Sequence, residues 1–196
     1  MLITTPTIDT NGLTLRLERQ HTELVKMDMS QVVVAPPGAR WSMSFTLRPF
    51  TEREGREWYS ALTQLSNLEN TFEALPPDFG GTISGYIGPN PVVNGGGQLG
   101  TSLTCDGVTA STLIARAGDY MEVQGAFKVI TADAISDGTG NVTLNFEPAI
   151  RQPIPDNAVV ELQAPKVTMR LANPEAVLGV RLSQLYGMTV DAAEAF

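Results

Sequence analysis

Residues 117–133 read AGDYMEVQGAFKVITAD, and residues 137–148 read DGTGNVTLNFEP. Polar and apolar side chains alternate from Tyr120 to Gln124, and residues 126–130 are rich in β-branched and aromatic side chains. Such a pattern is typical of half-buried strands, and the Gly, Asp and Asn residues between them favour tight turns. The two stretches therefore predict a β-meander. They contain no histidine, cysteine or nucleophile motif, which favours a structural or binding protein.

The composition of the whole chain supports a mainly β protein. Its 196 residues are 42% hydrophobic, enough for a substantial core, and its 18 Gly and 13 Pro indicate many turns. The formal net charge of −8 argues against non-specific binding to nucleic acid or to an anionic membrane. The N-terminal residues have neither the basic region nor the apolar core of a signal peptide. We therefore expect a soluble protein made in the cytoplasm.

Two alternating segments and one helix are predicted in the first part of the chain. Apolar residues alternate with polar ones over residues 13–17 and again over residues 41–47. Thr51 and Glu54 fit a capping box, which opens an amphipathic helix predicted over residues 52–68. The apolar stripe of this helix is expected to pack on the apolar face of the second strand. The core residues predicted for this contact are Trp41, Phe45, Trp58, Leu62 and Leu65.

These elements predict a mainly β fold with one amphipathic helix and two domains. Residues 1–80 are expected to form a β-sandwich with the helix. Residues 81–165 are expected to form a small β-barrel or sandwich, with a Gly/Pro-rich loop at residues 88–97. Residues 166–196 are expected to return to the first domain. Because this last segment is rich in apolar side chains, we expect it to dock and not to fray.

No residue is assigned a catalytic, cofactor-binding or metal-binding role. Residues 95–100 match G-x-G-x-x-G, but neither a preceding strand nor a following helix is predicted, as a dinucleotide site requires. The single histidine, His21, has no predicted nucleophile or acid beside it. Residues 133–141 lack the ligand pattern of a calcium loop. Cys105 is the only cysteine, so no intramolecular disulfide is possible and a small buried side chain is predicted.

Three blocks of the sequence resemble the distal tail proteins of long-tailed bacteriophages and gene transfer agents. The first block is residues 41–51, which lead into the Trp58 helix and on to residues 70–74. The second is residues 117–151. The third begins at residues 167–171 and ends with residues 185–196. The similarity covers most of the chain and lies in the order and combination of these blocks.

The resemblance implies a virion protein that forms a hexameric ring at the distal end of a phage tail. The N-terminal domain would be the belt that makes the ring, and the second domain would project outward. The tail tube would stack on one face of the ring and the tail-tip hub proteins on the other, leaving a passage for DNA. The candidate assembly or core residues are Trp41, Phe45, Trp58, Leu62, Leu65, Leu182, Leu185 and Tyr186.

Three alternatives remain open. A tail-tube or tube-terminating protein would be one β-sandwich with a long assembly loop. A carbohydrate-binding module of the tail tip would need exposed aromatic side chains along a groove, for which Tyr86, Tyr120 and Trp58 are candidates. An enzyme is not expected, because the chain has one histidine, one cysteine and no catalytic motif.

Overall fold

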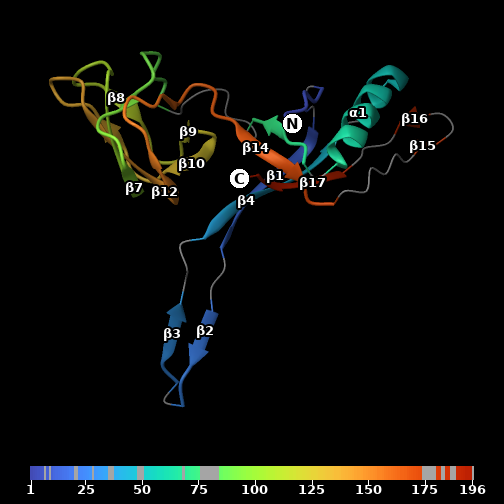
Figure 1. Cartoon of the computed structure of the whole chain (residues 1–196), viewed down its shortest axis with the longest axis horizontal. Coiled ribbons are helices and arrows are strands. Elements are labelled where there is room, and N and C mark those ends of the chain that lie inside the picture. The colour runs from blue at the N-terminus through green and yellow to red at the C-terminus, as the bar shows by residue number, and fades with distance from the viewer. Residues whose placement is uncertain are drawn as a thin grey trace.

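A computed structural model gives the fold of the chain. It describes residues 1–6, 8, 10–19, 22–27, 29–34, 38–47, 51–67, 69–75, 84–173, 180–181, 184–185 and 189–195. Figure 1 shows a five-stranded sheet in the middle of the molecule, with a barrel-like sheet on one side of it and the helix on the other. A long hairpin arm projects from the sheet.

The five-stranded sheet is antiparallel throughout and joins segments from both ends of the chain. Its order is β1-β4-β17-β14-β5. The strands are β1 (Thr10–Arg19), β4 (Ala39–Leu47), β17 (Thr189–Glu194), β14 (Val167–Leu171) and β5 (Phe72–Ala74). Residues 167–171 and 189–194 therefore lie within the same sheet as the N-terminal strands.

One face of this sheet carries the core of the first half of the molecule. Along β4 the odd-numbered residues are buried, and Phe45 lies directly opposite Leu13 on β1 and Val190 on β17. The ring of Trp58 on the helix lies 6.5 Å from the ring of Phe45. The helix thus covers the Phe45 end of the sheet, as the alternation along β4 predicted.

Helix α1 (Glu52–Leu65) begins with the predicted capping box. The Thr51 backbone N–H donates to the Glu54 carboxylate at 2.9 Å, and the Glu54 N–H donates back to the Thr51 hydroxyl at 3.4 Å. The helix ends at Leu65, three residues before the predicted end at residue 68. Asn70 Nδ2 donates to the Gln64 carbonyl at 2.8 Å, so a side chain satisfies a terminal carbonyl that another helical turn would have used. Leu68 lies outside the described residues.

The second sheet has six strands in the order β13-β9-β10-β12-β7-β6 and is almost closed on itself. The strands are β6 (Val92–Val93), β7 (Gln98–Asp106), β9 (Tyr120–Val123), β10 (Ala126–Ile130), β12 (Val142–Ile154) and β13 (Val160–Glu161). Its first and last strands meet where Val93 N–H donates to Ala158 O at 2.9 Å and Val160 N–H donates to Pro91 O at 2.8 Å. A short pair, β8 (Leu113–Ala115) and β11 (Ala134–Ile135), lies beside it.

The predicted meander is confirmed within this barrel. Strands β9 and β10 are joined by the two-residue turn Gln124–Gly125, in which both residues have positive φ, 51° and 75°. This turn type matches the twist of paired strands. Asp137, at the turn before β12, accepts hydrogen bonds from the backbone and side chains of Thr139 and Asn141. These bonds hold the pKa of its carboxyl far below its usual range.

The two parts of the molecule touch through Trp41 and Phe127. Their rings pack edge to face at a centroid distance of 5.5 Å, and Trp41 Nε1 donates to the Phe127 carbonyl at 3.0 Å. The Phe127 side chain is fully buried and belongs to the core of the five-stranded sheet, although its strand belongs to the barrel. The predicted fold class, a mainly β chain with one helix, a β-sandwich part and a barrel-like part, is confirmed.

Candidate assembly interface

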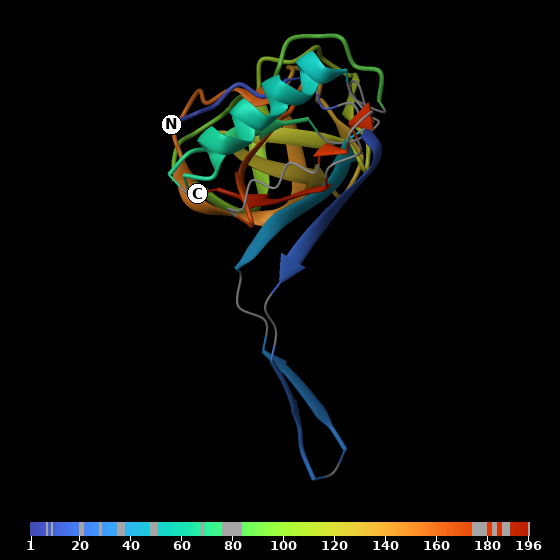
Figure 2. The same cartoon turned by 90° about the vertical axis from the view of Figure 1, so that its right-hand side faces the viewer.

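A hairpin arm extends away from the rest of the molecule. It consists of β2 (Thr22–Val25) and β3 (Gln31–Val34), joined by the turn at residues 26–30, and it continues the hairpin of β1 and β4 outward. Figures 1 and 2 show, from two directions, that the arm stands clear of the sheet, the barrel and the helix. We call residues 22–34 the arm.

The arm exposes large apolar side chains. Leu24 and Val32 lie directly opposite each other across the two strands, so they form one apolar pair. The exposed fractions are 57% for Leu24, 59% for Val25, 82% for Met29 and 39% for Val32, and Met27 is fully exposed. Exposed large apolar side chains gathered on one element are typical of an interaction site.

The base of the arm is anchored to the body. At the end of β1, Arg19 Nη2 lies 2.9 Å from Glu147 Oε2 on barrel strand β12. Beside it, Arg40 Nε lies 3.0 Å from Glu18 Oε2. Both pairs are half-exposed, so each contributes little to stability. The Arg19–Glu147 pair links the end of β1, where the arm begins, to the barrel. The Arg40–Glu18 pair links β1 to β4 within the sheet.

The structure places the predicted assembly or core residues in different locations. Trp41, Phe45, Trp58, Leu62 and Leu65 are all buried in the core of the five-stranded sheet, each exposed by 6% or less. Leu185 lies on β16 (Gln184–Leu185), which pairs with β15 (Val180–Arg181). Leu182 and Tyr186 lie outside the described residues. The five buried side chains are thus available for packing in the core and not for contact with a partner.

Sequence reasoning missed the arm as an exposed element. The pattern of residues 32–34 predicts only the end of a strand, and that of residues 20–22 predicts a polar turn. Period-two patterning cannot distinguish a strand that packs on a core from one that projects into solvent. The available signal was the pair of short apolar runs around Lys26 to Ser30, which is the pattern of an additional hairpin.

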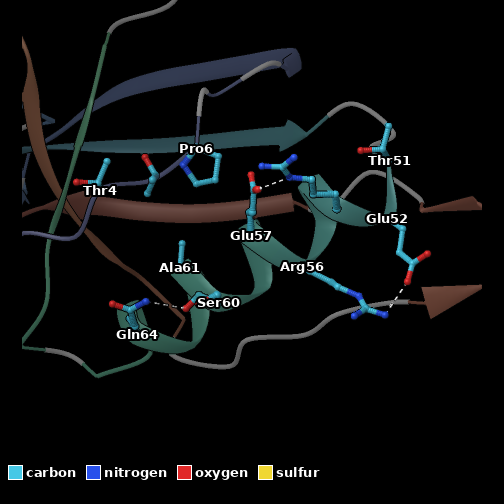
Figure 3. Close-up of a pocket in the computed structure, with 11 residues that line it drawn as sticks. Thr4, Pro6, Thr51, Glu52, Arg56, Glu57, Ser60, Ala61 and Gln64 are labelled. Carbon is cyan, nitrogen blue, oxygen red and sulfur yellow. Dashed lines mark hydrogen bonds and ion pairs between the residues drawn. The ribbon is translucent and has the colours of Figure 1, made fainter.

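A groove runs between the N-terminal segment and α1. Its volume is about 990 Å³, with Thr4, Thr5 and Pro6 on one side and the polar face of the helix on the other (Figure 3). The charged side chains along the helix are already paired: Arg56 Nη2 lies 2.6 Å from Glu52 Oε1, and Arg53 Nε lies 3.0 Å from Glu57 Oε1. These i, i+4 pairs stabilise the helix, and the groove otherwise offers hydroxyl and amide groups.

The residues considered above for catalysis or ligand binding lie in surroundings that indicate a structural role. Cys105 is fully buried in the barrel, as predicted, and burial raises the pKa of its thiol to about 12, so it is not a candidate nucleophile. Gly95 and Gly97 form the turn between β6 and β7, where the Gly95 N–H donates to Asp156 Oδ1 at 2.8 Å. The described residues contain no group of three potential metal ligands. His21 lies outside the described residues.

The three aromatic residues considered for carbohydrate binding are not open platforms. Trp58 is 2% exposed, and Tyr86 is 8% exposed with its hydroxyl donating to Pro89 O at 3.0 Å. Tyr120 is half-buried, with its ring 5.1 Å from that of Phe127. Within the described ranges, the exposed aromatic side chain is Tyr59 on α1, at 44%.

A second cavity lies at one end of the barrel, where the β9–β10 turn and the end of β12 face the five-stranded sheet. We call it the barrel-end pocket. Its volume is about 510 Å³, and it is lined by residues 123–126, Lys128, residues 150–155, Thr168 and Ala195. Lys128 pairs with Met121 across β9 and β10, and Met121 belongs to the barrel core. The Lys128 side chain therefore lies on the inner side of the barrel wall.

Lys128 is a buried cation with few partners. It is 3% exposed, and its Nζ donates to the Ala149 carbonyl at 3.3 Å. Within the described part of the chain, no carboxylate oxygen lies within 4.0 Å of Nζ. Burial lowers the pKa of the ammonium to about 8, with smaller opposing contributions from Glu194 and Glu147.

We expect the stability of the chain to rise with pH because of Lys128. Its pKa is about 8 in the folded chain and near the ordinary 10.5 when unfolded, so between these values the unfolded state holds more protons. Folding therefore becomes more favourable as pH rises through this window, by up to about 3 kcal/mol. Urea unfolding of the wild type and of Lys128→Met at pH 7.5 and 10.5, in carboxylate-free buffer, measures this as a difference between the two proteins.

Comparing the wild type with Lys128→Met cancels the contributions of Cys105, Tyr120 and the other titratable groups that both proteins share. If the wild type gains no stability relative to Lys128→Met over this range, the Lys128 ammonium is solvated in the folded chain.

No protein-family model matches the chain, and no curated protein sequence matches it. Among the described residues, no helix is long and apolar enough to cross a membrane.

Proposed function

We propose that this chain is a structural virion protein: a distal tail protein that assembles into a hexameric ring. In this proposal the ring joins the tail tube to the tail-tip hub proteins and leaves a passage through which DNA moves without specific binding. The protein would be made in the host cytoplasm and located at the distal end of the tail. The observation that carries the proposal is the exposed apolar arm.

An arm of this shape favours a ring for a geometric reason. It projects from one side of the subunit, and in this proposal it packs on a different surface of a second copy. Contacts between two different patches are heterologous, and they close into a ring when the rotation between copies is suitable. Among the described strands, β1, which leads into the arm, lies at the edge of its sheet, where a strand can pair with a neighbour.

The resemblance to distal tail proteins gives the proposal its specific form. The first block includes β4 and the start of α1, the second includes β9, β10 and β12, and the third includes β14 and β17. These are the elements that build the sheet, the barrel and the contact between them. No charge-dense basic surface is expected from a chain of net charge −8, which is compatible with a passage that does not retain DNA.

The alternatives differ in observable ways. A tail-tube protein would stack into open-ended tubes, whereas a distal tail protein would stop at a discrete ring. A carbohydrate-binding module would use the barrel and would not need the arm. The burial of Trp58 and Tyr86 leaves that alternative without its expected aromatic platform.

The test is whether the arm controls assembly. The mass of the purified protein in solution and electron-microscope class averages should reveal a six-fold ring for the wild type. The variant Leu24→Thr, Val25→Thr, Met27→Gln, Val32→Thr should be at least tenfold less assembled at equal concentration, because the apolar surface is removed while the strand propensity is kept. Its melting temperature as a monomer should be unchanged, since these side chains are exposed.

The matched control changes four equally exposed apolar residues of the barrel. These are Ile87, Leu99, Ile135 and Val159, each replaced by threonine. The control variant should assemble like the wild type. If both four-residue variants form rings, the arm does not assemble the protein. If the wild type stays monomeric both alone and with tail-tube protein, the ring proposal is wrong, and glycan binding by the barrel becomes the next test.

A further inference from the structure

We propose that the barrel-end pocket is a carbonyl-reactive site, in which the amine of Lys128 forms an imine with a short aliphatic aldehyde. The proposal concerns the barrel alone and does not depend on ring formation. It begins from the position of Lys128, whose side chain is 3% exposed and lines this cavity of about 510 Å³.

The surroundings of the Lys128 amine disfavour its charged form. Within the described part of the chain, Nζ makes one hydrogen bond, 3.3 Å to the Ala149 carbonyl, although an ammonium has three N–H donors. Burial lowers the pKa of the amine to about 8; Arg151 acts in the same direction, and Glu194 and Glu147 act in the opposite one. The effect of Arg151 is electrostatic, so it requires none of the hydrogen-bonding groups of Arg151 to be free. A lysine that is desolvated or close to another cation is a typical nucleophile toward carbonyl compounds.

The lowered pKa gives Lys128 a large share of neutral amine at mildly basic pH. At pH 7.5 a group with a pKa of about 8 is about one quarter neutral, whereas an ordinary lysine is about 0.1% neutral. The chain has two other lysines, Lys26 and Lys166, and both are exposed. An ion pair with Glu73, at 2.7 Å, raises the pKa of Lys166. The fold therefore activates Lys128 as a nucleophile and does the opposite at Lys166.

Imine formation at this amine needs no oxidant or reductant. The lone pair of the neutral Nζ attacks the carbonyl carbon, and the carbonyl oxygen takes a proton from the nitrogen, which gives a carbinolamine. The C–O bond then breaks, the nitrogen lone pair forms the C=N bond, and the oxygen leaves as water with both amine protons. The neutral imine carries no charge into the buried site, which favours the product over the buried ammonium.

The walls of the pocket favour an aldehyde with an apolar chain. Val123, Ile150 and Ile154 line it and belong to the barrel core, and Pro153 and Pro155 add further apolar surface. Its volume lies within the range of about 300–1,000 Å³ that is usual for small-molecule sites, and the mouth of a barrel is a common place for one. Each methylene group of the aldehyde that leaves water should strengthen binding about fourfold.

The test treats the full chain with butanal and sodium cyanoborohydride in phosphate buffer at pH 7.5. The reagent reduces an imine to a stable secondary amine, and mass spectrometry of peptides taken over time gives the rate at each lysine and, separately, at the N-terminal amine. Lys128 should be alkylated at least tenfold faster than Lys26, the exposed control in the same chain. In concentrated guanidinium chloride the three lysines should react at similar rates, because the pocket is lost.

A change of aldehyde tests the apolar walls. Replacing acetaldehyde by butanal adds two methylene groups, and it should raise the rate at Lys128 at least fivefold relative to the rate at Lys26. The variant Lys128→Arg keeps the positive charge without a nucleophilic amine. It should lose the rapid alkylation and keep the slow alkylation of Lys26 and Lys166.

Three results would overturn the proposal. Alkylation of Lys128 no faster than that of Lys26 in the folded chain would mean that aldehydes do not reach the buried amine. The same ratio of the two rates with and without guanidinium chloride would show that the fold does not activate Lys128. An equal gain at both lysines on going from acetaldehyde to butanal would exclude contact between the aldehyde chain and the apolar walls.

Discussion

Removal of residues 189–196 should leave a chain in which the five-stranded sheet does not fold. Strand β17 lies between β4 and β14, so its loss takes one of two ladder partners from each and separates the β1–β4 pair from the β14–β5 pair. The core also loses Val190 and Ala192, and the Trp41 N–H loses its acceptor on Glu194. We expect a cost of more than about 5 kcal/mol, comparable with the whole stability of many domains.

Tryptophan fluorescence measures this directly. Trp41 and Trp58, the two tryptophans of the chain, both lie in the core of this sheet. Their emission should have the long wavelength of exposed indole before any denaturant is added. A matched pair of point variants avoids the truncation: Val190→Asp places a charge in the core, whereas Thr189→Asp places it on the exposed side of the same strand. A truncated chain with blue-shifted emission and a cooperative transition would contradict the strand order.

The expected loss of the five-stranded sheet on truncation decides which variants can test assembly. Shortening the chain from residue 177 would remove β17, so a lost ring would report a lost fold. The arm variant described above changes only side chains that the monomer leaves exposed, and it therefore separates assembly from folding.

Trp58→Ala should destabilise the chain by about 3–5 kcal/mol, the usual cost of replacing a fully buried large aromatic side chain by alanine. Trp58 is 2% exposed and packs between the helix and Phe45. Its loss leaves a cavity in the middle of the contact that holds α1 on the sheet. Urea unfolding followed by circular dichroism measures the change.

Tyr59 is the control, because it is the next residue of the same helix and is 44% exposed. Tyr59→Ala should change the free energy of unfolding by no more than about 0.5 kcal/mol. Similar losses for the two variants would mean that the helix does not present its Trp58 side to the sheet.

Much of the fold is predictable from local patterns. The alternation along residues 41–47 gave the buried side of β4, and Thr51 with Glu54 gave the start of α1. The turn at Gln124–Gly125 and the strands on either side of it followed from the composition of residues 117–133. Each of these features depends on residues close in sequence, whose spacing alone decides which side of an element is apolar.

The burial of Lys128 and the exposure of the arm were harder to predict from the sequence. Lys128 is one of 13 basic residues, and no pattern separates it from an exposed lysine. Its burial depends on β12 and on the segment at β17, which lie well beyond the β9–β10 hairpin in the sequence. The arm has the same strand pattern as a buried hairpin, and only the absence of a packing partner in the described structure distinguishes it.

Local patterns in the sequence were enough to predict β4 with its buried side, α1 with its capping box, and the hairpin of β9 and β10. The tertiary structure decided their partners: β17 between β4 and β14, Phe127 in the core of the other sheet, Lys128 at the end of the barrel and the arm in solvent. The physical reason is that hydrophobic burial is non-directional. A pattern states that a side chain will leave water, and long-range packing selects the surface against which it does so.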